Sequence, residues 1–190
     1  MKGRLRLAVA IAVVAALAVV VTTAIAGGGN DIRERLTGYE EDPLVLSTTG
    51  TGTFSAWIDE SESRIFYRLS FENLEGDVTQ AHIHFGGRHQ SGGISVWLCV
   101  NPTADPPLTA PMGTPKCEGI ADTVTGTIRA KDVVGPAAQG IEPKAFGELV
   151  AAIRAGVTYA NVHSVKYPGG EIRAQLERDR HDWGGHLAKR

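Results

Sequence analysis

The chain has 190 residues, of which 43% are hydrophobic and 21% are charged, and its formal net charge at pH 7 is −2. This length and composition suit one domain with a hydrophobic core. The mild negative charge, without a basic stripe, argues against a partner that is nucleic acid or an anionic membrane surface.

The first 26 residues have the layout of a secretory signal peptide. Three basic residues precede an unbroken apolar run over 7–21, and an A-x-A cleavage site follows at 24–26. Cleavage would leave residues 27–190, with 16 Lys and Arg against 21 Asp and Glu and no stable membrane span. We therefore expect a secreted, extracytoplasmic protein. An uncleaved N-terminal membrane anchor is the alternative, since apolar character continues thinly to Ile25.

After a short linker over 27–35, the chain is expected to form a series of strands. Segments 51–58 and 64–71 are rich in β-forming residues and flank a polar turn, so they predict a hairpin. Further strands are expected over 78–85, 94–98 and 123–129. The large aromatic residues are expected to pack in the core or between sheets: Phe54, Trp57, Phe71, Trp97 and Phe146.

Two cysteines flank a loop that contains five prolines. Cys99 and Cys117 lie at its ends, and the prolines forbid regular strand pairing between them. In an exported protein an even number of cysteines indicates a disulfide. A metal-binding cysteine pair is the alternative, but the two residues are far apart in sequence and have no adjacent ligand.

One helix is predicted near 143–155. Apolar residues recur at helical spacing from Phe146 to Ile153, and Gly156 follows where a helix would end. We expect a final hairpin from 157–163 and 171–176, and a polar, disordered tail over 177–190. Short antiparallel strands with one helix predict a mainly β fold, either an antiparallel β-sandwich or a small Greek-key barrel.

Three histidines lie on two of the expected strands. Strand residues alternate between faces, so His82 and His84 point to one side while Ile83 points to the other. Asn161 and His163 share a face of the later strand in the same way. All three histidines are therefore predicted to lie on a polar face, away from the core.

This pattern predicts a candidate metal site. H-x-H places two imidazoles on one side of a strand with Cα atoms roughly 6.5–7 Å apart, close enough to chelate one ion. With His163 on a neighbouring strand, His82 and His84 would form a three-imidazole set suited to zinc or copper. His89 is a candidate fourth ligand, and Glu171 and Asn161 are candidates to orient the rings. The alternative interpretation is a solvated strand face that happens to carry histidines.

The motifs also carry a resemblance. A-H-I-H at 81–84, N-V-H-S at 161–164 and Y-P-G-G-E-I-R at 167–173 occur in this order. Together they resemble the CHRD domain family, named for repeats in chordin, from about Leu36 to Leu176. The resemblance implies an extracellular, mainly β domain over 36–176, often found as a stand-alone exported protein in bacteria, and it implies no established reaction. The loop from Cys99 to Cys117 departs from the family pattern as an apparent insertion.

Three functions are compatible with these observations. The first is an exported binding or structural module for an unknown extracellular protein or matrix partner, which needs only the fold, the leader and the family. The second is a zinc or copper protein, and the third is a copper-dependent redox enzyme. Catalysis is not expected, because the chain has no G-x-S-x-G motif and no convergent catalytic set. The acidic run at 40–42 is interpreted as a solvated rim.

Overall fold

The structure is a computed structural model that describes residues 30–59 and 61–177. The predicted leader and all of the predicted tail beyond residue 177 lie outside the described residues. Strands and helices follow the order β1 (Asp31–Thr37), η1 (Gly38–Glu40), β2 (Thr51–Ile58), β3 (Ile65–Glu72), β4 (Val78–Phe85), β5 (Gly93–Val100), β6 (Asp122–Ile128), η2 (Ala130–Asp132), η3 (Ala137–Gln139), α1 (Phe146–Arg154), β7 (Thr158–Ser164) and β8 (Ile172–Gln175).

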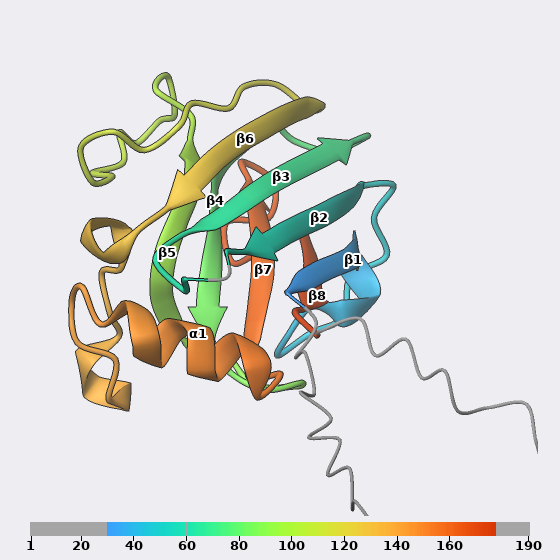
Figure 1. Cartoon of the computed structure of the whole chain (residues 1–190). Helices are drawn as coiled ribbons and strands as arrows, with labels where there is room; N and C mark the ends of the chain where they lie inside the picture. Colours follow the sequence, from blue (N-terminus) through green and yellow to red (C-terminus); the bar gives the residue numbers. More distant parts are fainter. Residues whose placement is uncertain (1–29, 60, 178–190) are drawn as a thin grey trace, which may run out of the picture.

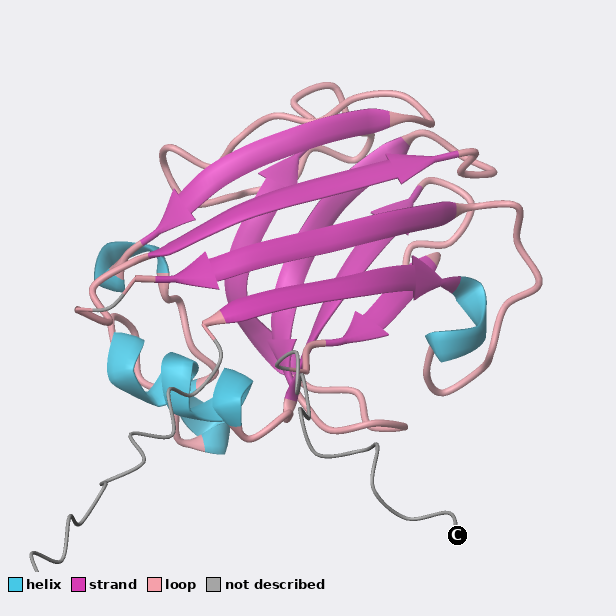
Figure 2. Cartoon of the chain, turned by 45° about the vertical axis from the view of Figure 1, so that its right-hand side comes forward, coloured by secondary structure: helices cyan, strands magenta, loops and turns pink. Residues whose placement is uncertain are grey.

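The eight strands found in this part of the chain form one antiparallel sheet. Their order is β5-β4-β7-β8-β1-β2-β3-β6. The sheet curls until its edge strands β5 and β6 approach each other, so that it forms a nearly closed barrel (Figures 1 and 2). The mainly β prediction is confirmed, and of the two expected architectures the structure has the barrel.

The core lies inside the barrel and follows the alternation of the strands. In β3, for example, Ile65, Leu69 and Phe71 are buried while Phe66 and Arg68 face outward. Helix α1 lies across one end of β4, β5 and β7 and adds its buried apolar face to the same core (Figure 1). The helix lies within the predicted segment 143–155.

The first strand was not predicted. Residues of the expected linker over 27–35 form most of β1, which pairs with β2 from Asp31 opposite Trp57 to Thr37 opposite Thr51. Only Ile32 and Leu36 are apolar and buried, and they lie four residues apart among charged side chains. This spacing lacks the strict alternation that indicates a strand.

The aromatic prediction is correct for the three phenylalanines and wrong for Trp57 and Trp97, of which Trp97 is half-buried on the outer face opposite His82. Phe54, Phe71 and Phe146 are buried, but Trp57 is 40% exposed and stacks on Phe66 across β2 and β3 with ring centroids 5.6 Å apart. Trp57 lies on the outer face of the barrel. An aromatic side chain therefore does not by itself mark the inward face of a strand.

The disulfide joins the end of β5 to the loop that follows it. The Sγ atoms of Cys99 and Cys117 are 2.11 Å apart, and both residues are buried in the core. The Val100 amide donates a hydrogen bond to the Pro115 carbonyl, and the Cys117 amide donates one to the Val100 carbonyl. The long proline-rich loop is thus anchored where it leaves and rejoins the barrel.

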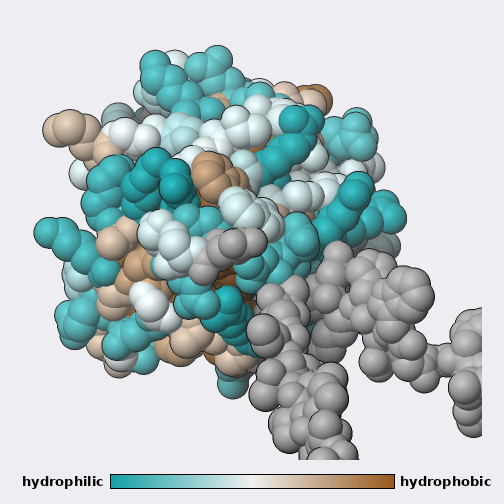
Figure 3. All heavy atoms as spheres, viewed as in Figure 1, coloured by the Kyte–Doolittle hydropathy of each residue, from teal (hydrophilic) through white to brown (hydrophobic). Residues whose placement is uncertain are grey.

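The surface is mostly hydrophilic on the face shown in Figure 3, where hydrophobic residues form small patches between polar ones. No helix in the described residues has the length and apolar character needed to cross a membrane.

Candidate metal centre

Strands β4 and β7 are neighbours, and this brings the three histidines together. His82 lies opposite Asn161 in the strand register, and Gln80 lies opposite His163. Ile83 and Val162 point into the core from the same two strands. The histidines therefore share the outer face of the barrel, as the alternation predicts.

This outer face is buried. The side chains of His82, His84 and His163 are only 1%, 8% and 6% exposed. Loops of the chain cover them: residues 86–92 fold over His84, and the turn before β8 folds over His163. The interpretation of this face as a solvated surface is therefore wrong, because strand alternation does not reveal that loops return over it.

The ring nitrogens lie close enough to share one ion. One nitrogen from each of His82, His84 and His163 lies within 4.8 Å of the other two. The closest pair, His82 Nδ1 and His163 Nε2, is 3.3 Å apart. A tetrahedral zinc ion with Zn–N bonds of about 2.0–2.1 Å has its ligand nitrogens about 3.3 Å from one another. This pair therefore has the spacing of one edge of such a tetrahedron, although the two atoms now share a hydrogen bond and the His82 proton would have to move to Nε2 for Nδ1 to bind an ion.

Backbone carbonyls fix the tautomers of two of the rings. His84 Nδ1 lies 2.9 Å from the Gly92 carbonyl oxygen, and His163 Nδ1 lies 2.9 Å from the Pro168 carbonyl oxygen. A carbonyl oxygen only accepts hydrogen bonds, so Nδ1 carries the proton in both rings. The lone pair then resides on Nε2, as in histidines that bind a metal and donate their other N–H to a carbonyl.

All three imidazoles are held in the neutral form. Burial lowers the pKa of His82 well below its usual range, and neighbouring histidines lower it further. Burial also lowers the pKa of His84 to about 4 and lowers the pKa of His163. Neutral imidazole is the form that coordinates metal ions, so no imidazole has to lose a net proton at pH 7.

Two aromatic rings frame the cluster. Trp97 packs on His82 in a T-shaped arrangement with ring centroids 4.4 Å apart. Tyr159 stacks on His84 with centroids 4.8 Å apart and an interplanar angle of 2°. The hydroxyl oxygen of Tyr159 accepts a hydrogen bond from the Gly92 amide, the residue whose carbonyl holds His84. The rings restrict how far the imidazoles can move.

The structure places the other predicted site residues elsewhere. His89 is exposed in the loop after β4 and lies outside the histidine group. Glu171 Oε1 accepts hydrogen bonds from Thr48 and from the Glu75 amide rather than from an imidazole. Asn161 Nδ2 donates to Glu41. The ring orientation expected from Glu171 and Asn161 comes instead from carbonyl oxygens, which every residue carries and no motif marks.

Glu41 was missed as a buried residue. It is 5% exposed, and its Oε2 accepts a hydrogen bond of 3.2 Å from Asn161 Nδ2. Burial raises the pKa of Glu41 to about 7, against the smaller lowering effects of Asn161 and Arg173. The interpretation of the acidic run at 40–42 as a solvated rim is therefore wrong for Glu41. Nothing in the local sequence separates it from its exposed neighbour Glu40.

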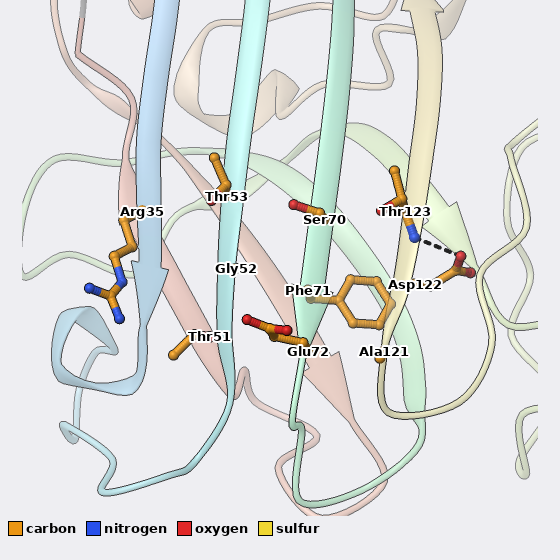
Figure 4. Close-up of a pocket in the computed structure, with 10 residues that line it drawn as sticks. All are labelled: Arg35, Thr51, Gly52, Thr53, Ser70, Phe71, Glu72, Ala121, Asp122 and Thr123. Carbon is orange, nitrogen blue, oxygen red and sulfur yellow. Dashed lines mark hydrogen bonds between the residues drawn. The ribbon is translucent and has the colours of Figure 1, made fainter.

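A groove of about 600 Å³ lies on a different part of the barrel, across the outer faces of β1, β2, β3 and β6 (Figure 4). Threonines, Arg35, Glu72 and Asp122 are among its lining residues. None of the predicted site residues lines this groove. The histidine cluster and the groove are therefore separate features.

A family model for the CHRD domain matches residues 33–176. The chain belongs to the CHRD domain family. The matched CHRD segment begins within β1 and ends just after β8, so it contains the barrel and all three histidines. CHRD domains are extracellular, and the buried Cys99–Cys117 pair fits such a compartment. The comparisons with curated proteins and with solved structures give no match.

Proposed function

We propose that this chain is an exported CHRD module that binds one zinc or copper ion through His82, His84 and His163. The observation that carries the proposal is the buried cluster itself, in which one nitrogen of each ring lies within 4.8 Å of the other two. Imidazole suits both zinc and copper, and a three-histidine set leaves one coordination position for another ligand.

An unpaired nitrogen atom supports the proposal. His84 Nε2 is buried and has no hydrogen-bond partner. A buried polar atom without a partner costs about 1–3 kcal/mol, so this nitrogen needs a compensating interaction. The tautomer of His84 leaves the lone pair on its unpaired nitrogen, which is the atom that a metal ion would bind.

The proposed role is binding and stabilisation rather than catalysis. The three side chains are almost fully buried, and Trp97 and Tyr159 pack against two of them. A substrate would have to displace these rings or the covering loops to reach an ion. The predicted leader, the family and the disulfide support export.

Metal analysis of the purified protein tests this function. Protein secreted by an expression host would be stripped with a chelator, reloaded separately with Zn(II) and with copper, desalted and analysed for metal content. We expect one ion per chain. The His82→Ala/His84→Ala variant should lose the ion while keeping the far-ultraviolet circular dichroism of a β protein.

His89→Ala is the matched control, because His89 is exposed in the adjoining loop and lies outside the cluster. It should retain one ion per chain. If the double variant does not fold, His84→Ala alone serves the test, since His84 is the most exposed of the three. The proposal fails if wild-type protein binds no ion, or if removal of the cluster histidines leaves the metal content unchanged.

A further inference from the structure

Arg173 is a buried cation beside the histidine cluster. It lies on β8 opposite Asn161 of β7 and is 2% exposed. Its Nη2 donates hydrogen bonds of 3.0 and 3.1 Å to the carbonyl oxygens of Gly87 and Gln90. In the described residues it forms no ion pair with a carboxylate within 4 Å. A buried positive charge is costly unless its interactions compensate for lost hydration, so this position calls for an explanation.

The guanidinium reaches the cluster through Tyr159. Its central carbon lies 3.5 Å from the centroid of the Tyr159 ring, and that ring stacks on His84. The two distances place the guanidinium within about 8 Å of the centre of the His84 ring. Stacking of a cation on an aromatic face is favourable, and the planar guanidinium suits it better than an ammonium group.

The same arginine holds the loop that orients His84. Arg173 binds the carbonyls of Gly87 and Gln90 near the start and middle of the loop. Gly92 at its end accepts the His84 Nδ1 proton and donates its own amide proton to Tyr159. Arg173 thus contacts both the loop over residues 86–92 and the Tyr159 ring that stacks on His84.

We propose that Arg173 positions His84 for metal binding and that its charge makes the site favour Cu(I) over Cu(II) and Zn(II). This inference rests on the proposed function. The three imidazole ligands are neutral, and no carboxylate belongs to their group in the described chain. The electrostatic repulsion between Arg173 and a divalent ion would therefore be about twice the repulsion between Arg173 and a monovalent ion at the same position.

Glu41 is the carboxylate that could offset this charge. It interacts electrostatically with Arg173, but burial raises its pKa to about 7, so it is only partly ionised at neutral pH. At an effective dielectric constant of about 20, one extra unit charge at about 8 Å changes an equilibrium constant by roughly tenfold or more. Arg173 is a positioning residue in this scheme, because it acts through Tyr159 and the loop.

The test compares Arg173→Gln, Arg173→Lys and the control Arg68→Gln with wild-type protein. Arg68 is exposed on β3, away from the cluster strands. Competition with chromophoric chelators would give the dissociation constants for Cu(I) and Zn(II), and redox titration of the copper form would give its midpoint potential. In Arg173→Gln we expect the preference for Cu(I) over Zn(II) to fall about tenfold. The Cu(II)/Cu(I) potential should fall by about 60 mV, the one-electron equivalent of tenfold.

Arg173→Lys separates charge from position. Lysine keeps the charge but loses the planar fork, so both ions should bind more weakly while the preference between them changes less than threefold. Arg68→Gln should change neither quantity. A purely structural role of Arg173 would weaken the binding of both ions equally in Arg173→Gln and leave the preference unchanged, and that result overturns the inference.

The outcomes also distinguish this inference from the proposed function. Wild-type protein that binds no ion refutes both, whereas an ion that is bound with an unchanged preference in Arg173→Gln refutes only the inference. If Arg173→Gln does not fold, Arg173→Met removes the same charge with an unbranched side chain, and the same fall or absence of a fall in the preference for Cu(I) decides.

Discussion

The barrel has two polar outer faces, of which one is buried under loops and the other is open to solvent. The face of β4, β7 and β8 carries histidines, Asn161 and Arg173, all of them buried. The face of β1, β2, β3 and β6 carries threonines and charged side chains around an open groove (Figure 4). Both faces arise from the same alternation of residues along strands. Alternation therefore decides which side of the sheet a residue occupies, and the loops decide whether water reaches it.

The connections between strands explain the difference. Residues 86–92 and the turn before β8 fold back over the histidine face, and their carbonyl oxygens accept hydrogen bonds from its side chains. The turn between β2 and β3 closes on itself instead, because Asp59 accepts hydrogen bonds from the amides of Ser63 and Arg64. Buried polar groups on one face therefore depend on loops that fold back over the strands, and exposed groups on the other face do not.

Gly170→Ala should disrupt the packing of the turn before β8 over the histidine face. A Cβ at Gly170 would lie 2.6 Å from the side-chain atoms of Asn161 and 2.7 Å from Glu41 Oε2, and Gly170 has a φ of +135°. We expect a loss of about 4 kcal/mol in the free energy of unfolding, measured by urea denaturation. Gly169→Ala is the control, since a Cβ there meets nothing within 4 Å. Equal free energies of unfolding for the two variants would show that the turn at Gly170 is not tightly packed against Asn161 and Glu41.

The disulfide tests how far the edge of the histidine face depends on a covalent link. Cys99 lies opposite Ala81 in the register of β5 and β4, next to the histidines. Replacing both Cys99 and Cys117 by serine should lower the free energy of unfolding by about 3 kcal/mol, from the entropy of the closed loop in the unfolded chain. The measurement is denaturant unfolding of both proteins without reductant. An unchanged midpoint would show that the loop needs no covalent link.

Glu41→Gln should show that the buried carboxylate of Glu41 makes stability depend on pH, whereas an exposed carboxylate does not. Because burial raises the pKa of Glu41 from 4.5 to about 7, its contribution to stability is present below pH 4.5 and is lost as the pH rises through 7. Glutamine cannot ionise, so the variant should be more stable than the wild type by about 2 kcal/mol at pH 8 and should lose this advantage near pH 4. Thermal unfolding at both pH values measures the difference. Glu40→Gln, at an exposed position, is the control and should show no such trend.

Thr125→Ala should have the smallest effect. Thr125 is exposed on β6 and lies opposite Arg68 of β3, on the open face. We expect a change below about 0.5 kcal/mol in the free energy of unfolding, since no buried group loses a partner. Urea denaturation checks this value. A loss above 1 kcal/mol would show that the open face is packed more tightly than its exposure indicates.

The sequence was sufficient for the fold class, for the helix and for naming the three histidines as one candidate site, because these depend on local periodicity and on a family pattern. It could not show that the two histidine strands are neighbours, which the structure establishes. It could not reveal the burial of His84, which depends on the loop after its strand folding back over it, or the burial of Glu41, which depends on a contact 120 positions away in the chain. It also could not assign the partners of the imidazole N–H groups, since Gly92 and Pro168 contribute only backbone oxygen atoms. Strand β1 was missed because its two buried residues, Ile32 and Leu36, lie too far apart to show alternation.

The wide sequence separation of the cluster has a consequence for handling the protein. His82 and His163 are 81 positions apart, and the contact between Glu41 and Asn161 spans 120 positions. A fragment that lacks either end of this span cannot assemble the histidine face. One tightly held ion per chain would thus serve as a stoichiometric assay of complete folding, sensitive to truncation at either end.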